Sequence, residues 1–389
     1  MTATTAAGSS PTGPERSAAE RRLFAVLAGG GTAGHVQPAL AVAEALVAAG
    51  CDREHLLFVG AVRGQEATLV PAAGYPLCLL PGRGIRRSAD PANLRAAAEL
   101  GLALVRSVAL LTRRHPEVVV SFGGYAALGP ALAAVLLRIP LVVVNPDATT
   151  TGTNRLVGRF ATAVATGWSG TGLPRAVVTG APLRAQVVHA ARAPGGRALA
   201  RAARGIAPDA TVVAVVGGSL GSGTLNAAAR QLAEAWAARA GTVLWHVVGG
   251  RNWAAHAGPV LPEGGLRYEA VPYEDDLPGL FLAADVVVSR AGAGSVAELA
   301  ALGRPSVLVP LPRAPRDHQL ANATALATAG AAVIIADEQC SGTRLAALLD
   351  ELLGEPGRLE QMGGAARRLG RLDAAQAIAE LVLRRGNSR

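Results

Sequence analysis

The sequence predicts an α/β protein built from two similar Rossmann-like domains that face each other across a cleft. Short aliphatic runs alternate with alanine-rich helical segments along the chain, a pattern typical of βαβ units and parallel sheets. Both halves open in the same way, with a strand, a glycine turn and a helix. A length of 389 residues, 50% of them hydrophobic, provides enough chain for two cores.

The predicted strands are short aliphatic runs with the composition of strands that are buried on both faces of a parallel sheet. In the first half they are Leu23–Ala28, Leu56–Val59, Leu77–Leu80, Val118–Ser121, Leu141–Val144 and Ala163–Thr166. In the second half they are Val212–Val216, Val243–Val247, Asp285–Ser289, Ser306–Val309 and Ala332–Ile335. The two series indicate weak internal symmetry and not an array of short repeats.

One segment, Ala126–Val144, is apolar enough to suggest a membrane span. Pro130, Arg138 and Pro140 interrupt it, however, and the run Leu-Val-Val-Val follows Pro140 directly. We therefore predict a helix and then a buried strand in this segment.

The boundary between the two halves is predicted near residues 180–192. Residues 22–183 then form the first domain and residues 184–344 the second. Residues 345–389 are expected to form helices that cross back to the first domain. Residues 1–21 are rich in Ser, Thr, Ala, Gly and Pro and lack the basic-then-apolar order of a signal peptide, so we expect a disordered lead.

The net charge of +9 suits an acidic partner such as a nucleic acid, a phospholipid surface or a phosphorylated substrate. The chain contains no lysine, and the codon bias of a GC-rich genome would produce the same excess of arginine. The three cysteines, Cys51, Cys78 and Cys340, have neither metal-ligand nor redox spacing. This pattern favours a reducing compartment and argues against a disulfide framework.

The first glycine turn follows the first predicted strand. Gly29, Gly31 and Gly34 form the pattern G-x-G-x-x-G before a helix, so backbone amides and the helix N-terminus are expected to face an anion. A dinucleotide-binding domain would carry an acidic residue after its second strand, but Gly60 stands there, which argues against an NAD site. His35 lies at the mouth of the turn, either as a general base or as a polar residue at a helix end.

The second half contains two glycine turns. Gly217 and Gly218 repeat the first turn, and Ser219 adds a hydroxyl, which makes a suitable cradle for a diphosphate. The segment Ser289–Glu298 again runs from a strand through a glycine turn into a helix. Its Glu298 can accept hydrogen bonds from both hydroxyls of a ribose, or it is an ordinary surface residue of an amphipathic helix.

Five motifs occur in register between about residues 23 and 336. They are Gly-Gly-Gly-Thr-Ala-Gly-His-Val-Gln-Pro-Ala-Leu-Ala-Val-Ala from Gly29, Ser-Phe-Gly-Gly-Tyr from Ser121, Val-Gly-Gly-Ser-Leu-Gly from Val216, Ser-Arg-Ala-Gly-Ala-Gly-Ser-Val-Ala-Glu from Ser289, and Asp-His-Gln-Leu-Ala-Asn-Ala from Asp317. Together they resemble the MurG family, which adds N-acetylglucosamine to undecaprenyl-pyrophosphoryl-muramoyl-pentapeptide and so completes lipid II. The resemblance implies a GT-B fold and a role in peptidoglycan synthesis.

The resemblance also implies the residues of the site. UDP-N-acetylglucosamine is expected to bind mainly to the second domain, through Arg184, Ser219, Arg290, Ser295, Glu298 and Gln319. The acceptor is expected to meet Gly30, Gly31, Thr32, Gly34, Tyr125 and Asn145 of the first domain. The reaction would be a single inverting displacement, with His35 as the first candidate for the general base and Asp147 as the second. Arg184, Ser219 and backbone amides would stabilise the leaving UDP, so neither a metal nor a cofactor is expected.

One segment departs from the family pattern. Where the family usually carries His-Glu-x-Asn, this chain has Val144-Asn145-Pro146-Asp147, so a charge and an amide are exchanged. Because this segment borders the acceptor site, alternatives stay open. They are a related enzyme that glycosylates another polyprenyl-phosphate or phosphoglycolipid acceptor, a UDP-sugar epimerase with the same fold, and a non-catalytic UDP-sugar-binding protein.

A lipid-linked acceptor requires the enzyme to approach a membrane. The segment Arg83–Arg87, Leu94 and the helix that carries Leu100, Leu104 and Val108 place basic side chains beside apolar ones. Such a patch attracts anionic lipid, unless it is a docking face packed on the sheet. We expect a peripheral protein on the inner, cytoplasmic face of the cell membrane. Its partners would be a polyprenyl-pyrophosphate-linked acceptor and an anionic membrane surface, with no nucleic acid.

Overall fold

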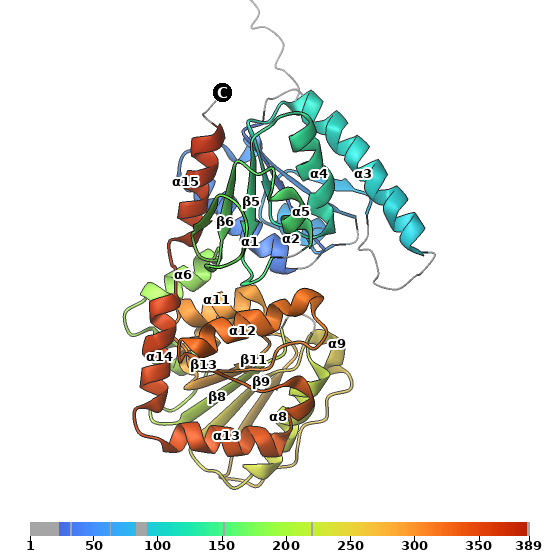
Figure 1. Cartoon of the computed structure of the whole chain (residues 1–389). Helices are drawn as coiled ribbons and strands as arrows, with labels where there is room; N and C mark the ends of the chain where they lie inside the picture. Colours follow the sequence, from blue (N-terminus) through green and yellow to red (C-terminus); the bar gives the residue numbers. More distant parts are fainter. Residues whose placement is uncertain are drawn as a thin grey trace, which may run out of the picture.

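The computed structural model describes residues 23–31, 33–62, 64–82, 92–150, 152–218 and 221–386. The predicted lead and the predicted site residues Thr32, Ser219 and Arg83–Arg87 lie outside these ranges. Two parallel sheets form the centres of two domains, and helices cover both faces of each sheet (Figure 1). The predicted two-domain α/β fold is confirmed.

The first domain contains a seven-stranded sheet in the order β3-β2-β1-β4-β5-β6-β7, and every pair is parallel. The strands are β1 (Ala25–Ala28), β2 (Leu56–Ala61), β3 (Leu77–Leu80), β4 (Val118–Ser121), β5 (Leu141–Asn145), β6 (Ala163–Thr166) and β7 (Ala176–Val178). One face packs on α1 (Ala33–Ala48), α2 (Glu66–Ala72) and α15 (Ala374–Gly386). The other face packs on α3 (Ala92–Arg114), α4 (Tyr125–Leu136) and α5 (Gly152–Val157).

The second domain contains a six-stranded parallel sheet in the order β10-β9-β8-β11-β12-β13. The strands are β8 (Thr211–Val216), β9 (Thr242–Val247), β10 (Arg267–Val271), β11 (Val286–Ser289), β12 (Ser306–Leu308) and β13 (Ala332–Ile334). One core includes residues of α6 (Ala185–Arg192), α7 (Gly196–Ala202), α10 (Leu277–Ala283), α11 (Ala293–Ala301), α12 (His318–Thr328) and α14 (Arg358–Leu369). The other includes residues of α8 (Gly223–Ala235) and α13 (Gly342–Gly354), and the short helix α9 (Gly250–Trp253) follows β9.

The chain crosses between the domains twice. Residues 179–184 lead from β7 to α6, and residues 370–373 lead from α14 back to α15, whose Ile378 and Val382 are buried in the core of the first domain. The two crossings touch, because a Cβ atom on Gly180 would lie 2.5 Å from the Cβ of Arg371. The two connections between the domains therefore pack against each other.

Every predicted strand is present, with its ends shifted by at most two residues. Two of the four edge strands, β7 and β10, were not predicted from the sequence. The segment Ala126–Val144 forms most of α4 and then β5, as predicted. Within the part of the chain that the structure describes, no helix has the length and apolar character that crossing a membrane requires.

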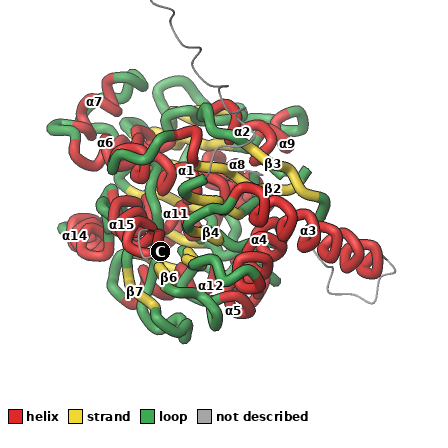
Figure 2. The backbone as a smooth tube through the Cα atoms, turned by 90° about the horizontal axis from the view of Figure 1, so that it is seen from above, coloured by secondary structure: helices red, strands yellow, loops and turns green. Residues whose placement is uncertain are grey.

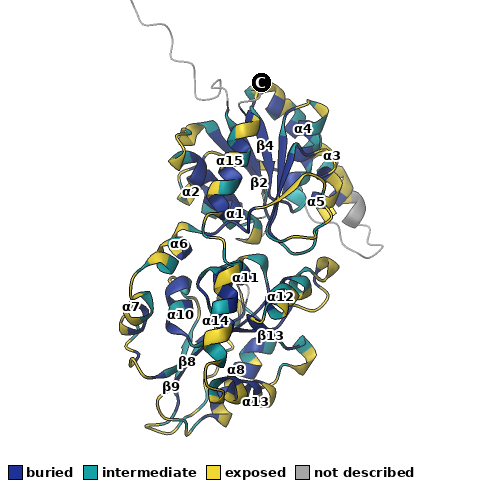
Figure 3. Ribbon diagram, turned by 60° about the vertical axis from the view of Figure 1, so that its left-hand side comes forward, coloured by how far each residue is buried: buried dark blue, intermediate teal, exposed yellow. Residues whose placement is uncertain are grey.

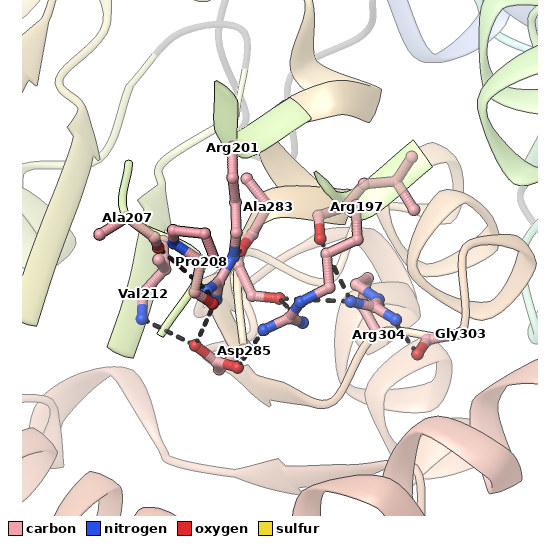
Figure 4. A network of polar contacts seen from close by, with 11 residues as sticks. Arg197, Arg201, Ala207, Pro208, Val212, Ala283, Asp285, Gly303 and Arg304 are labelled. Carbon is pink, nitrogen blue, oxygen red and sulfur yellow. Dashed lines mark hydrogen bonds and ion pairs between the residues drawn. The ribbon is translucent and has the colours of Figure 1, made fainter. Parts of the chain in front are cut away.

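Buried strands lie at the centre of each domain, and the outer faces of the helices are exposed (Figure 3). At the amino end of β11, Asp285 pairs with Arg197 at 2.5 Å and with Arg201 at 3.0 Å (Figure 4). Arg304 donates to carbonyl oxygens at the end of α10. Burial, together with neighbouring arginines, lowers the pKa of Arg304 to about 10. These arginines serve as helix C-terminal caps, so this part of the positive charge is structural.

Candidate active site

The first glycine turn connects β1 to α1 and carries predicted acceptor residues. Gly31 has a φ of 94°, a conformation that strains any residue with a side chain. Its backbone N–H donates to both carboxylate oxygens of Glu66, at 3.2 and 3.1 Å. The Tyr125 ring lies against the turn, because a Cβ atom on Gly31 would be 2.9 Å from its Cε1. Gly30, Gly31 and Tyr125 therefore lie together, and Gly34 is exposed in the first turn of α1.

His35 follows this turn in α1, and its side chain is half-buried. A hydrogen bond links it to the backbone of Gly30. Burial lowers the pKa of His35 below its ordinary value and His318 adds to this effect, whereas the carboxylates of Asp147 and Glu66 oppose it. The result is an imidazole that is mostly neutral at pH 7 and can accept a proton.

The loop after β5 begins with Asn145, which is completely buried. Its Nδ2 donates to the carbonyl oxygens of Asp147 at 2.8 Å and Thr149 at 3.4 Å, and its Oδ1 accepts from Asn154 at 3.1 Å. We predicted a direct contact between Asn145 and the acceptor, but these bonds engage both ends of its amide inside the protein. Asn145 therefore holds the loop that contains Asp147 and Thr149, and its contact with an acceptor stays a prediction.

Asp147 joins the first domain to the second. Its Oδ1 accepts from Nδ2 of Asn322 in α12 at 2.9 Å, and the backbone N–H of Ala148 donates to Oδ1 of Asn322 at 2.8 Å. Asn322 is completely buried and also donates to the carbonyl oxygen of Ala291, in the turn before α11. Asn322 belongs to the motif that begins at Asp317 but was not predicted as a site residue, because its partner Asp147 is 175 residues away in the chain.

Two predicted donor-binding residues contact each other. Glu298, which is 8% exposed, accepts from Nε and Nη2 of Arg184 at 3.1 and 2.8 Å. Burial raises the pKa of Glu298, and the charge and hydrogen bonds of Arg184 oppose this rise. Since Arg184 directly precedes α6, the pair lies where the chain enters the second domain.

Arg290, a third predicted donor-binding residue, is buried among internal partners. Its Nη1 donates to Asp337 at 2.5 Å and also reaches the carbonyl oxygens of Val309 and Pro310. Its Nη2 donates to the hydroxyl of Ser222 at 2.7 Å. We predicted that Arg290 lines the donor loop, and in this structure its guanidinium is engaged by Asp337, Ser222 and two backbone carbonyl groups.

Gln319 and Ser295 complete the donor side. Oε1 of Gln319 accepts from the backbone N–H groups of Ala291 at 3.2 Å and Leu311 at 2.9 Å. Ser295 is half-buried in the first turn of α11, and the N-cap residue of that helix, Gly292, has no side chain. The partial positive charge at this helix N-terminus is therefore not neutralised by a capping side chain, which suits an anionic ligand.

Comparison with known proteins identifies the family. The models of the glycosyltransferase family 28 N-terminal and C-terminal domains match residues 25–166 and 212–379. A UDP-N-acetylglucosamine–N-acetylmuramyl-(pentapeptide) pyrophosphoryl-undecaprenol N-acetylglucosamine transferase from Desulforudis audaxviator is 37% identical over 92% of this chain and 97% of its own. MurG from Acinetobacter baumannii superposes with a TM-score of 0.73 at 27% identity, covering 94% of this chain and 99% of its own. The chain belongs to the MurG family.

Membership of the MurG family makes the chain a glycosyltransferase. A UDP-GlcNAc 2-epimerase from Neisseria meningitidis also superposes, with a TM-score of 0.62 over 93% of this chain and 100% of its own, but at only 13% identity. A likeness at that identity reflects the shared fold alone. The epimerase alternative therefore gains no support from this similarity.

The structure explains what the exchanged residues of this MurG family member do. The amide of Asn145 faces inward, and the charge of Asp147 meets the amide of Asn322 across the domain boundary. In this chain the segment thus contributes an interdomain hydrogen bond to a carboxylate, and such bonds are stronger than neutral ones.

Exchanging these two side chains tests that bond. Asn322→Asp places two carboxylates together and is expected to lower kcat/KM, whereas adding Asp147→Asn restores one donor and one acceptor and recovers part of the loss. A double-mutant cycle in kcat/KM should then give a coupling energy of about 0.5 to 3 kcal/mol. Strictly additive effects of the two substitutions would show that the contact does not matter in the working enzyme.

Proposed function

We propose that this enzyme transfers N-acetylglucosamine from UDP-N-acetylglucosamine to a muramoyl-pentapeptide carried on polyprenyl pyrophosphate, converting lipid I to lipid II. The observation that carries the proposal is the position of His35. A half-buried imidazole with a lowered pKa lies in the acceptor domain, in the electrostatic field of Asp147, which itself is bonded to the donor domain. The activity for which the relatives are named supports the same donor and acceptor.

In the proposed mechanism, the acceptor hydroxyl attacks the anomeric carbon on the face opposite UDP, which inverts its configuration. His35 takes the proton of that hydroxyl as its oxygen forms the new bond. Arg184, the uncapped N-terminus of α11 and the second glycine turn stabilise the charge that develops on the leaving diphosphate. Because Arg184 and Glu298 bind each other here, donor binding would separate them, Arg184 toward the diphosphate and Glu298 toward the ribose.

A second candidate is a diverged enzyme that glycosylates another polyprenyl-phosphate or phosphoglycolipid acceptor. This candidate is favoured by the burial of Asn145 and by the hydrogen bond between Asp147 and Asn322. A changed set of polar contacts beside the acceptor site changes which acceptor the enzyme binds. The comparison that separates the candidates is UDP release with the donor alone, with lipid I, and with other polyprenyl-linked sugars. Release only with lipid I supports the first candidate, and release only with another polyprenyl-linked sugar supports the second. Conversion of the donor alone would contradict both and indicate an epimerase.

Membrane association is part of the proposal. The helix α3 extends beyond the rest of the first domain (Figure 2), and it exposes Leu102 by 44% and Val105 by 65%, next to the exposed Arg106. Leu104 and Val108, which we predicted on this patch, instead pack against the core. The apolar part of the surface thus lies about one residue away from the predicted stripe, on the outward face of the same helix. It suits a peripheral position on the cytoplasmic side of the cell membrane.

Binding to lipid vesicles tests this surface. The protein is expected to sediment with phosphatidylglycerol vesicles more than with phosphatidylcholine vesicles, and less as salt rises, because charge attraction is screened. Replacing Arg83, Arg86 and Arg87 by Gln should weaken binding by about 1 kcal/mol per arginine. Leu199→Ser, a change at an exposed leucine of the second domain, should have no effect. Equal binding to both lipids, or unchanged binding without the arginines, would contradict the membrane proposal.

A further inference from the structure

Glu66 is a buried acid that the proposed mechanism does not yet use. It is 1% exposed and belongs to the first turn of α2, directly behind the first glycine turn. Its carboxylate accepts hydrogen bonds from the backbone N–H of Gly31 and, at 2.7 Å, from that of Ala61 at the end of β2. One side chain therefore ties the turn after β1 to the end of the neighbouring strand.

The side chain of Glu66 packs against three glycines, at positions where a Cβ atom would overlap it. A Cβ atom on Gly30 would lie 2.2 Å from Oε1 of Glu66, one on Gly60 would lie 2.3 Å from its Cγ, and one on Gly64 would lie 1.9 Å from its Oε2. Heavy atoms do not approach so closely, so no other residue type fits at these positions while Glu66 stays in place. Gly30 belongs to the first glycine turn, which suggested a site for an external anion, and the negative charge next to it is that of the internal residue Glu66.

The turn that Glu66 holds also contacts His35. Its hydrogen bond goes to the backbone of Gly30, in the turn that Glu66 holds. The charged and titratable groups that act on His35 are Asp147 from the loop after β5, Glu66 from α2 and His318 from α12. Glu66 thus acts on His35 both through the backbone and through its charge.

We propose that Glu66 is a positioning residue of the transferase: its carboxylate fills the anion position of the first glycine turn and holds Gly30 and His35 in place for proton transfer. A pyrophosphate-linked acceptor therefore does not bind at the N–H of Gly31, which Glu66 already occupies. The negative charge of Glu66 also raises the pKa of His35 against the effect of burial. The catalytic part of this inference rests on the proposed role of His35.

Glu66→Gln removes the charge and puts an amide N–H₂ toward backbone donors. We expect kcat to fall about 10- to 100-fold, since small misplacements of a catalytic group cost that much, with KM for UDP-N-acetylglucosamine little changed. NMR titration of the histidine ring carbons, with His35 assigned by its loss in His35→Gln, should show a lower pKa for His35 in the variant. Glu44→Gln, at an exposed position of α1, is the matched control and should leave both quantities unchanged.

Gly64→Ala provides a second test that keeps the charge and displaces the carboxylate. It should also lower kcat, whereas Gly354→Ala, where a Cβ atom would meet no atom within 4 Å, should not. Wild-type kcat in Gly64→Ala, or an unlowered pKa of His35 in Glu66→Gln, would overturn the inference. If Glu66→Gln does not fold, Gly64→Ala alone decides. The titration needs no substrate, so a chain that transfers no sugar yet shows the lowered pKa contradicts only the proposed function.

Discussion

Replacing His35 by alanine is expected to lower kcat by about 10²- to 10⁴-fold, the usual contribution of a general base. The affinity for UDP should change little, because the proposed base acts on the acceptor hydroxyl and the predicted donor-binding residues lie in the second domain. Steady-state kinetics and calorimetry with UDP measure the two quantities. His55→Ala, at the amino end of β2, is the control that should leave both unchanged.

The pH dependence separates His35 from Asp147 as the base. A base works in its deprotonated form, so activity should persist as pH falls until it reaches the pKa of His35, which burial holds below the ordinary histidine value. Asp147 raises that pKa, and Asp147→Asn should therefore move the acid limb of kcat/KM to lower pH while activity survives. Loss of activity in Asp147→Asn together with near-normal activity in His35→Ala would assign the base to Asp147.

Replacing Glu298 by alanine is expected to weaken UDP binding by about 1.5 to 3 kcal/mol, the range for hydrogen bonds to charged groups. The structure adds a second reason, since Arg184 loses the carboxylate that holds it at 2.8 Å. Calorimetry on the purified variant measures the loss, and Glu351→Ala, at an exposed position of α13, is the control. Unchanged UDP affinity in Glu298→Ala would remove Glu298 from the donor site.

The central strands were predictable because both of their faces are buried. A strand such as β8 or β11 carries an almost continuous aliphatic run, which few other structures require. The edge strands β7 and β10 lack that run: all three residues of β7 are exposed, and β10 reads Arg-Tyr-Glu-Ala-Val. Because solvent reaches the side chains of these two strands, they do not need to be apolar. Their sequences therefore resemble those of loops.

The candidate site was predictable where local motifs specify it and not where distant segments meet. The glycine turns, His35 and Glu298 belong to short patterns, and the structure places His35 beside the first turn and Glu298 in the helix after the third. Asn322 lies in the motif that begins at Asp317, but the motif does not show that its partner is Asp147 across the domain boundary. Glu66 was missed for a related reason, since its partner Gly31 lies 35 residues away and only the fold brings them together.

The inward orientation of Asn145 and Arg290 could not be inferred from the sequence either. Polar side chains next to glycine turns are usually assigned to ligands, because such turns lie at the carboxyl ends of the strands. Here Asn145 bonds to its own loop, and Arg290 bonds to Asp337, which follows the last strand of its sheet. Whether a polar side chain faces a ligand or the protein depends on partners that the motif itself does not contain.

The transfer of labelled sugar to lipid I directly tests the proposed conversion of lipid I to lipid II. The purified protein would be incubated with UDP-N-acetylglucosamine labelled in the sugar, with and without lipid I, and the lipid phase would be extracted. We expect label to enter the lipid phase only with lipid I. Mild acid should then release the label as part of an intact disaccharide-pentapeptide that carries a β-linked N-acetylglucosamine. If all of the label stays in the water phase when lipid I is present, the proposed transfer is contradicted, whether or not the donor is consumed.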